Sequence, residues 1–285
     1  MTILVTGATG TVGRHLVEGL HAAGHRVRAL SRSPERAALP EGVEVVAGDL
    51  TDPGGLSAAF SDVTAVHFIG FDGADWSPLA RGRELADLAA RGGARRVTLL
   101  KGDPGRTDFE DALMAAAETG GAFALTRLAP VEFMANALEW AGSVREEGVV
   151  REAFPEARSA MVHEADIAAV AAAALTAEGH GGQEYWLTGP EALTAPGKVR
   201  TIAGVLGREV AYVELSREEI VARWRQEGYA ESDIAFFLAM RTDPPPAGYT
   251  VRPTVERVTG RPPRTFAAWV AEHAAAFTPG QDAGE

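Results

Sequence analysis

The glycine pattern at the start of the chain constrains its fold more than any other feature. Residues 2–6, TILVT, form a short β-branched run, and GATGTVG follows before the apolar spacing of a helix begins. A strand, a glycine turn and a helix in this order are typical of the first βα unit of a doubly wound sheet. Gly7 permits the tight turn, Gly10 permits close approach of the backbone to a ligand, and Gly13 permits close helix packing.

The same alternation continues through the first half of the chain. Short apolar runs alternate with helical patterns, and strands that are apolar on both faces are typical of a parallel sheet covered by helices on each side. We therefore predict an α/β fold with a doubly wound parallel Rossmann sheet. The runs that follow the first are RVRAL (26–30), VEVVAG (43–48), TAVHFIG (64–70), RRVTLL (95–100) and AFALTR (122–127).

The alternation of strand-like and helix-like segments becomes less regular after about residue 150. We predict a Rossmann domain over residues 1–150 and, over 151–285, a smaller C-terminal α/β lobe that binds substrate and returns segments to the sheet. Within this lobe Ser216 stands three residues before Glu219, the spacing of a helix-starting capping box. The stretch TFAAWVAEHAAAF (265–277) predicts one amphipathic helix, and the Gly, Asp and Glu tail after it predicts a disordered end.

Charge and composition exclude several classes of protein. Lys and Arg number 27 against 39 Asp and Glu, so the net charge of −12 disfavours nucleic acid and anionic membrane surfaces as partners. Without cysteine, no disulfide or thiolate chemistry is possible, and the seven histidines show no metal-ligand spacing. The chain shows no signal-peptide pattern, and its most apolar run, 167–177, is too short to span a bilayer. We therefore expect a cytoplasmic protein.

The glycine turn and the residues after the second and third strands predict a dinucleotide site. The phosphates would lie at the N-terminus of the first helix. After the second strand, ALSRSPER offers Ser31, Arg32 and Arg36 where NAD(H) proteins usually place an acid, which favours NADP(H). Alternatively, both arginines are merely solvated. In the same way, Asp49 and Leu50 either contact the adenine, or Asp49 only caps the next helix.

Several motifs together resemble one family. The chain is similar to the NmrA-like branch of atypical short-chain dehydrogenases/reductases over nearly its whole length. The resemblance implies a Rossmann domain, NADP(H) and a cleft between the sheet and a smaller lobe. It does not imply one reaction, because that branch includes reductases, lyases and non-enzymatic redox sensors. The matching motifs are VTGATGTVGRHLVEGL, VRALSRSPER, AGDLTD, TRLAPVEFMANAL, MVHEADIAAVAAAAL, YWLTGPEALT and PRTFAAWVAEHAAAF.

These observations give a set of predicted binding residues. The segment after the fourth strand, FDGADW, is expected near the nicotinamide, and PVEFMANAL resembles the family's cleft-lining segment, with a core position as the alternative for Phe133. The predicted cofactor-binding residues are Gly7, Thr9, Gly10, Thr11, Val12, Gly13, Ser31, Arg32, Arg36, Asp49, Leu50, Ile69, Gly70 and Lys101. The predicted substrate-binding residues are Phe71, Asp72, Trp76, Phe133 and Asn136. No metal site is predicted.

Candidates for the chemistry itself are few. The Tyr-x-x-x-Lys acid of typical short-chain dehydrogenases is missing, because none of the four tyrosines has Lys four residues later. Lys101, one of only two lysines, follows the fifth strand and could hydrogen-bond the nicotinamide ribose, polarise a substrate carbonyl, or form an ion pair with Asp103 or Asp108. His163 is a second candidate for proton transfer, with a structural role as the alternative.

The main hypothesis is an NADPH-dependent reductase. It would transfer hydride to a ketone, a quinone-like group or a conjugated carbonyl of a small molecule, since the nicotinamide itself supplies the difficult step. Two alternatives remain open: a non-catalytic NADP(H) sensor that binds a protein partner, and a cofactor-assisted epimerase or lyase. We expect a monomer or a homodimer.

Overall fold

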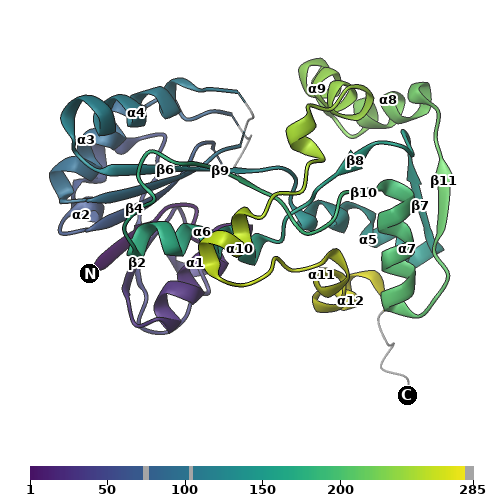
Figure 1. The fold of residues 1–285 in the computed structure, drawn as a ribbon, viewed down its shortest axis with the longest axis horizontal. Helices are drawn as coiled ribbons and strands as arrows, with labels where there is room; N and C mark the ends of the chain where they lie inside the picture. The colour runs from purple at the N-terminus through teal and green to yellow at the C-terminus, as the bar shows by residue number, and fades with distance from the viewer. Residues whose placement is uncertain (73–76, 103–104, 280–285) are drawn as a thin grey trace. The chain divides into compact units, whose positions relative to one another are not determined.

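Seven parallel strands form the central sheet of the computed structural model, which describes residues 1–72, 77–102 and 105–279 (Figure 1). The strand order is β3-β2-β1-β4-β5-β6-β9, with every neighbouring pair parallel. The predicted doubly wound Rossmann sheet is thereby confirmed. The strands are β1 (Thr2–Val5), β2 (Arg26–Ser31), β3 (Glu44–Ala47), β4 (Ala65–Ile69), β5 (Arg96–Leu100), β6 (Ala124–Pro130) and β9 (Glu184–Leu187).

Helices cover both faces of this sheet. On one face α3 (Gly82–Gly92) packs against α4 (Asp108–Gly120), and on the other α1 (Thr11–Ala22) packs against α6 (Glu164–Thr176) (Figure 1). The helix α10 (Thr254–Thr259) contacts α6 and β9. The shorter elements here are α2 (Ser57–Phe60) and the 3₁₀ helices η1 (Pro34–Arg36) and η2 (Pro53–Gly55).

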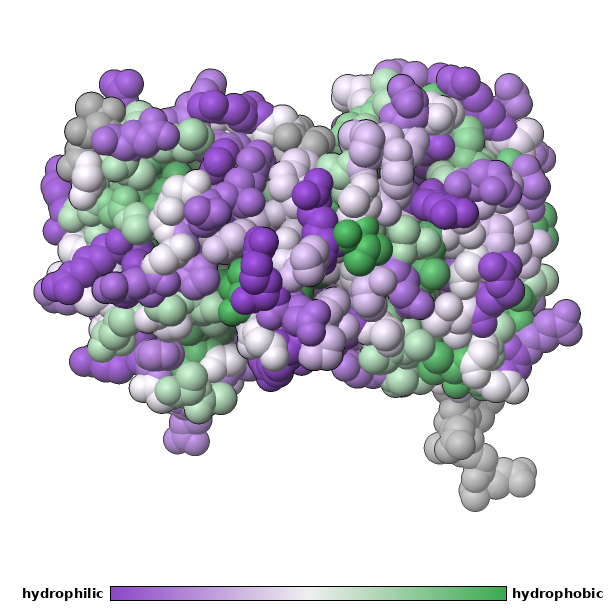
Figure 2. All heavy atoms as spheres, viewed as in Figure 1, coloured by the Kyte–Doolittle hydropathy of each residue, from purple (hydrophilic) through white to green (hydrophobic). Residues whose placement is uncertain are grey.

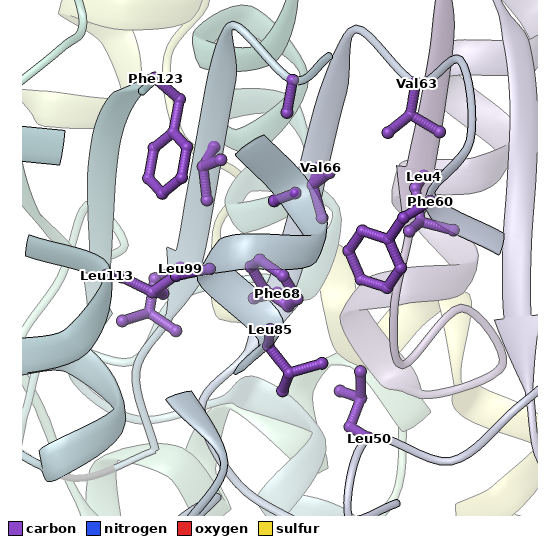
Figure 3. Packing of buried hydrophobic residues seen from close by; sticks show 14 of the residues in the cluster. Leu4, Leu50, Phe60, Val63, Val66, Phe68, Leu85, Leu99, Leu113 and Phe123 are labelled. Atoms are coloured by element: carbon purple, nitrogen blue, oxygen red, sulfur yellow. The ribbon is translucent and has the colours of Figure 1, made fainter. Parts of the chain in front are cut away.

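The core on the α3 and α4 side explains why the strands are apolar throughout. Phe68 of β4 stacks on Phe60 at 5.9 Å between ring centroids and meets the edge of Phe109 at 5.7 Å, and Leu85 and Leu99 pack beside it (Figure 3). Residues that alternate with Phe68 along β4 point to the opposite face. His67 therefore lies on the α1 and α6 side, where it is fully buried.

The chain divides into two compact units. The first comprises Met1–Pro130, Glu164–Leu187 and Thr254–Arg261, and the second Val131–His163, Thr188–Pro253 and Pro262–Glu285. The chain first leaves the sheet unit after Pro130, earlier than the expected boundary at residue 150, and it returns with α6, β9 and α10.

The second unit is built around two small strand pairs. β7 (Val149–Glu152) pairs parallel with β11 (Ala211–Glu214), and β8 (Arg158–Ser159) pairs antiparallel with β10 (Leu193–Thr194). The predicted capping box of Ser216 and Glu219 is present at the start of α8. The helical elements are η3 (Met134–Trp140), α5 (Ala141–Glu147), α7 (Ala195–Leu206), α8 (Arg217–Gln226), α9 (Glu231–Thr242), η4 (Pro246–Gly248), α11 (Phe266–Glu272) and α12 (Ala274–Phe277).

The prediction of one continuous helix over 265–277 is wrong. The backbone leaves helical values at His273, with ψ of 14°, and separates α11 from α12. The imidazole of His273 stacks on Trp269 with 4.1 Å between ring centroids, and its Nδ1 lies 2.8 Å from the Trp269 carbonyl oxygen. These contacts hold the chain at the break. The predicted disordered tail, residues 280–285, lies outside the described residues.

The surface is mainly polar on the face shown in Figure 2. Hydrophilic residues predominate among the coloured atoms there, and hydrophobic residues form small scattered groups. Across the described ranges, no helix combines the length and the apolar character that crossing a membrane requires. In the same part of the chain, no group of three or more His, Asp or Glu side chains is arranged to hold a metal ion.

Candidate cofactor site

The glycine turn between β1 and α1 has the geometry of a phosphate-binding loop. Gly7 has φ of +59°, a left-handed conformation that L side chains rarely adopt, and its carbonyl accepts a 2.9 Å hydrogen bond from the N–H of Gly10. A Cβ on Gly13 would lie 2.0 Å from the Gly7 carbonyl oxygen. The turn and the first helical turn therefore touch backbone to backbone, which requires glycine at both positions.

The N-terminus of α1 is open toward any ligand on this turn. Gly10 is the N-cap, so no side chain caps the helix, and the first regular bond runs from the N–H of Arg14 to the carbonyl of Gly10. The N–H groups of Thr11, Val12 and Gly13 precede that bond. Together with the helix dipole they favour a negatively charged group. Thr9 and Thr11 are exposed, whereas the Val12 side chain is buried and can offer only its backbone.

The sheet reverses its strand order beside this turn. β2 and β4 lie on either side of β1, so the crevice at the carboxyl ends of β1 and β4 is where such sheets bind ligands. The N–H of Ile69 donates to Oγ1 of Thr6 at 3.1 Å, and Gly70 donates to the Leu100 carbonyl at 2.9 Å. A Cβ on Gly7 would lie 2.8 Å from Cγ2 of Ile69. Ile69 and Gly70 thus border the glycine turn directly.

Two of the residues predicted for the 2′-phosphate lie at the end of β2. Ser31 is buried, and its Oγ accepts a 3.1 Å hydrogen bond from the N–H of Ser33. Arg32 is 49 % exposed, and its Nη1 donates to Oδ1 of Asp72 at 3.1 Å. Arg36 is 85 % exposed in η1 and contacts only Glu35, at 3.9 Å, among the described residues. Arg32 is therefore fixed beside the crevice, whereas Arg36 has the solvated geometry of the alternative interpretation.

Arg14 helps to hold the predicted 2′-phosphate region, a role that the sequence did not indicate. From the first turn of α1 it donates to the carbonyl oxygens of Ala38 at 2.7 Å and Ala37 at 3.3 Å. This contact ties the loop after β2 to the helix that begins at the glycine turn. The basic residue thus shapes the predicted 2′ region from outside the ALSRSPER motif.

The residues Asp49 and Leu50 after β3 are held by local contacts and by core packing. Asp49 closes a local turn, accepting from the N–H of Thr51 at 2.9 Å and from its hydroxyl at 2.8 Å. The backbone hydrogen bond of Thr51, aided by its hydroxyl and by the charge of Arg32, lowers the pKa of Asp49 against the opposing effect of burial. Leu50 is only 7 % exposed and belongs to the core, so it leaves little surface for an adenine ring.

Lys101 lies in a network of buried ion pairs. Its Nζ is 3.1 Å from Oε2 of Glu110 and 3.2 Å from Oε1 of Glu184, and Nη1 of Arg127 is 2.9 Å from Oε1 of Glu110. The sequence suggested Asp103 or Asp108 as ion-pair partners. Asp103 lies outside the described residues. The carboxylates that contact Lys101 are those of Glu110 on α4 and Glu184 on β9, and not that of Asp108. An ammonium held by two carboxylates favours the ion-pair interpretation over a free proton donor.

Four further residues were predicted to contact the substrate. Phe71 forms an antiparallel bridge with Pro78, and a Cβ on Gly102 would lie 2.5 Å from the Phe71 ring. Trp76 lies outside the described residues. In the second unit, Phe133 is half-buried before η3 and Asn136 is exposed on it. The structure therefore places these last two residues on a different unit from the glycine turn.

His163 also belongs to the second unit. It is fully buried, and its Nε2 lies 3.1 Å from Oε2 of Glu272 on α11. A proton donor has to reach the substrate, and the side chain of His163 is almost completely shielded. The arrangement favours the structural alternative for this residue.

Three of the tyrosines have surroundings that do not suit the role of the missing acid. Tyr185, the only one in the sheet unit, is buried on β9 with its hydroxyl 2.8 Å from Nδ1 of His180. In the second unit, burial followed by nearby carboxylates raises the pKa of Tyr212 to about 12, and burial also raises the pKa of Tyr229. The pKa of each of these two tyrosines is thus shifted away from the neutral range in which a proton donor is effective.

Comparison with known proteins identifies the family. A model described as NAD(P)H-binding matches residues 7–122. Over 291 residues the chain is 38 % identical to (4-alkanoyl-5-oxo-2,5-dihydrofuran-3-yl)methyl phosphate reductase of Streptomyces griseus, covering 97 % of this chain and 99 % of the relative. The chain belongs to the NmrA-like branch of atypical short-chain dehydrogenases/reductases. The resemblance seen in the sequence motifs is thus confirmed.

Two further similarities extend over nearly the whole chain. An NAD(P)H azoreductase of Xenophilus azovorans is 33 % identical over 293 residues, covering 96 % of this chain and 99 % of the relative. The crystal structure of an NADPH-dependent quinone oxidoreductase of Escherichia coli superposes with a TM-score of 0.75 at 25 % identity, covering 95 % of this chain and 99 % of that one. This NmrA-like protein is accordingly an oxidoreductase with an NAD(P)H-binding sheet unit.

Proposed function

We propose that this NmrA-like protein is an NADPH-dependent reductase that transfers hydride to a conjugated acceptor in a small organic molecule. The observation that carries the proposal is the open helix N-terminus on the glycine turn, with the guanidinium of Arg32 at the next strand end. The bound cofactor would supply the hydride. The protein's own residues hold the phosphates, shape the crevice and exclude water.

NADPH is proposed over NADH because of the residues at the end of β2. A ribose with a free 2′-hydroxyl is usually bound by an acid there, whereas a 2′-phosphate needs cationic and hydroxyl donors. Arg32 provides a guanidinium at this position, and Ser31 and Ser33 provide hydroxyls. The pyrophosphate would lie against the N–H groups of Thr11, Val12 and Gly13, where the helix dipole favours it.

The missing acid favours a conjugated acceptor over an isolated ketone. Hydride addition to an isolated ketone leaves an alkoxide about as basic as hydroxide, so the reaction needs a positioned proton donor. Addition to a quinone or a conjugated carbonyl leaves a delocalised anion, comparable to a phenolate with a pKa of about 10. Such an anion can take its proton from water.

The names of the relatives agree with this substrate class. One describes an unsaturated oxo-dihydrofuran phosphate, one an azo compound and one a quinone. Each of these acceptors contains a reducible system of double bonds. We extend this class, and not any one of these compounds, to the present chain.

For substrate binding we propose the second unit, whose helices carry flat apolar side chains. Tyr229, which is 40 % exposed, lies edge to face with Phe237 at 5.2 Å between centroids, and the buried Trp224 supports the Phe237 ring from 5.4 Å. The guanidinium of Arg241 lies 5.2 Å from the Trp224 centroid. Planar conjugated molecules bind well to such surfaces. Phe133 and Asn136 remain proposed contacts on η3 of the same unit.

The proposed setting follows from the sequence. We propose a cytoplasmic monomer or homodimer, with a small molecule as its partner and neither nucleic acid nor membrane, in keeping with the net charge of −12.

The decisive experiment uses NADPH labelled with deuterium on C4 of the nicotinamide. We expect a quinone, an unsaturated lactone or an azo compound to oxidise it. With the lactone, deuterium should appear on the carbon conjugated to the carbonyl, as detected by mass spectrometry. A saturated ketone of the same size should react at least a hundredfold more slowly. Tight NADPH binding without turnover on any acceptor would contradict the proposal and favour the sensor.

A further inference from the structure

The ion pair between Arg32 and Asp72 bridges two strand ends across a third. Arg32 follows β2 and Asp72 follows β4, and β1 lies between these strands in the sheet. The 3.1 Å contact from Nη1 to Oδ1 therefore crosses the carboxyl end of β1, where the glycine turn begins. Both partners border the crevice that a dinucleotide would occupy.

Backbone contacts hold Asp72 in this position. Its N–H donates to the Ser77 carbonyl at 2.8 Å, and Leu79 donates to the Gly70 carbonyl at 3.2 Å. Phe71 and Pro78 form a bridge between the same two segments. The Asp72 side chain is 21 % exposed, so its carboxylate is presented to Arg32 from an anchored stretch of chain.

A second carboxylate lies on the opposite side of Arg32. Asp49 follows β3, the strand next to β2, and is close enough to feel the charge of Arg32. Asp49 already has two hydrogen bonds from Thr51, whereas Asp72 bonds the guanidinium directly. Among these acids, Asp72 is thus the one in competition for the donors of Arg32.

We propose that Asp72 moderates the preference for NADPH by exchanging Arg32 with the 2′-phosphate. This inference rests on the proposed use of NADPH. In the free protein the guanidinium is paired with Asp72. When NADPH binds, its 2′-phosphate takes the donors of Arg32, and the Asp72 carboxylate separates because two anions repel at short range. NADH has no group that can take over Arg32, so the ion pair persists when NADH is bound.

The proposed exchange predicts how loss of the Asp72 charge changes the affinity for each cofactor. Removing the charge of Asp72 eliminates a competitor that only NADPH has to displace, so NADPH binds more tightly and NADH is unaffected. Asp72 therefore moderates the preference that Arg32 creates. It also promotes dissociation of NADP⁺, since the carboxylate is available to reclaim the guanidinium.

The test is calorimetric titration of NADPH and NADH into the unaltered protein and Asp72→Asn. We expect the NADPH Kd to fall by about three- to fivefold, the upper part of the range for a partly exposed ion pair, and the NADH Kd to stay within about twofold. In an Arg32→Ala background, adding Asp72→Asn should tighten NADPH much less than in the unaltered background, because only the repulsion between the carboxylate and the 2′-phosphate is removed, and the NADH Kd should not change. Asp87→Asn, which removes the same charge from an exposed site on α3, is the matched control and should change neither Kd.

Each other result overturns the exchange. Equal tightening for both cofactors would mean that the pair merely obstructs the crevice. Weaker NADPH binding would mean that Asp72 orients Arg32, and an unchanged NADPH Kd would mean that the pair has no role in binding. If the unaltered, folded protein bound neither cofactor, the proposed function would fall together with the inference. Thermal melts of every variant distinguish these outcomes from loss of folding.

Discussion

Nζ of Lys101 lies 3.1 Å from Oε2 of Glu110, and the two side chains are 7 % and 1 % exposed. The pair connects the end of β5 to the first turn of α4. Glu110 is almost completely shielded from solvent, so its negative charge has to be compensated by Lys101 and by Arg127. Nη1 of Arg127 lies 2.9 Å from Oε1 of Glu110. Breaking such a pair leaves a buried charge without full compensation.

Lys101→Met should therefore destabilise the protein without removing activity. We expect the free energy of unfolding to fall by about 2–3 kcal/mol, below the full effect of an orphaned charge because Arg127 remains. Below its lowered Tm, kcat and the NADPH Kd should stay within about threefold of the original values. Denaturant melts and steady-state kinetics measure these quantities.

Glu110→Gln supplies the second side of a double-mutant cycle. If the pair is structural, Lys101→Met should be much less destabilising in the Glu110→Gln background. A hundredfold loss of kcat with an unchanged Tm would contradict this prediction and return Lys101 to the chemistry.

The sequence could not identify which carboxylates pair with Lys101, because only the folded chain brings them together. Strand order predicts that residue 101 follows a central strand, and it does. Glu110 lies nine residues later on a helix and Glu184 lies 83 residues later on a strand that returns to the sheet. Only the pairing of β6 with β9 brings Glu184 near, and local spacing contains no signal of it.

The glycine turn was predictable for the opposite reason. Its requirements are local, since a left-handed Gly7 and the backbone contact with Gly13 lie within seven residues. The Arg32 and Asp72 contact is intermediate: the strand order of a doubly wound sheet places both residues beside β1, but only the structure shows that they pair. Leu50 follows the strand as expected, yet packing turns it into the core.

Arg32→Ala should abolish most of the preference for NADPH. We expect the unaltered protein to bind NADPH at least about tenfold more tightly than NADH, a difference of about 1.4 kcal/mol, and the variant to bind both about equally. Arg36→Ala is the matched control, because Arg36 is 85 % exposed and should leave the preference intact. Calorimetry on the three proteins decides the matter, and equal affinities in the unaltered protein would remove the assignment to NADPH.

Gly13→Ala should disrupt the cofactor turn, whereas Gly19→Ala on the same helix should not. A Cβ at residue 13 would lie 2.0 Å from the Gly7 carbonyl oxygen, but one at residue 19 has no atom within 4 Å. We expect Gly13→Ala to lower Tm and to weaken NADPH binding by more than about tenfold, since the turn must move. Gly19→Ala should keep the Kd and gain up to about 1 kcal/mol from helix propensity. Similar melts and affinities for both variants would show that the close approach is not required.

His67 should make the protein less stable in mild acid. Burial of the imidazole lowers its pKa from 6.5 to about 4. Nδ1 lies 2.8 Å from Oγ1 of Thr98, and the buried Nε2 has no hydrogen-bond partner among the described residues. The unfolded chain binds this proton more readily, so the stabilisation is fully present above pH 6.5 and declines as pH falls toward 4. At pH 5 the loss from this group is about 2 kcal/mol. Urea unfolding of the unaltered protein and of His67→Gln at pH 7.5 and pH 5 measures it: the variant should lose about 2 kcal/mol less between the two conditions, and an identical loss in both proteins would show that His67 is not the group that titrates.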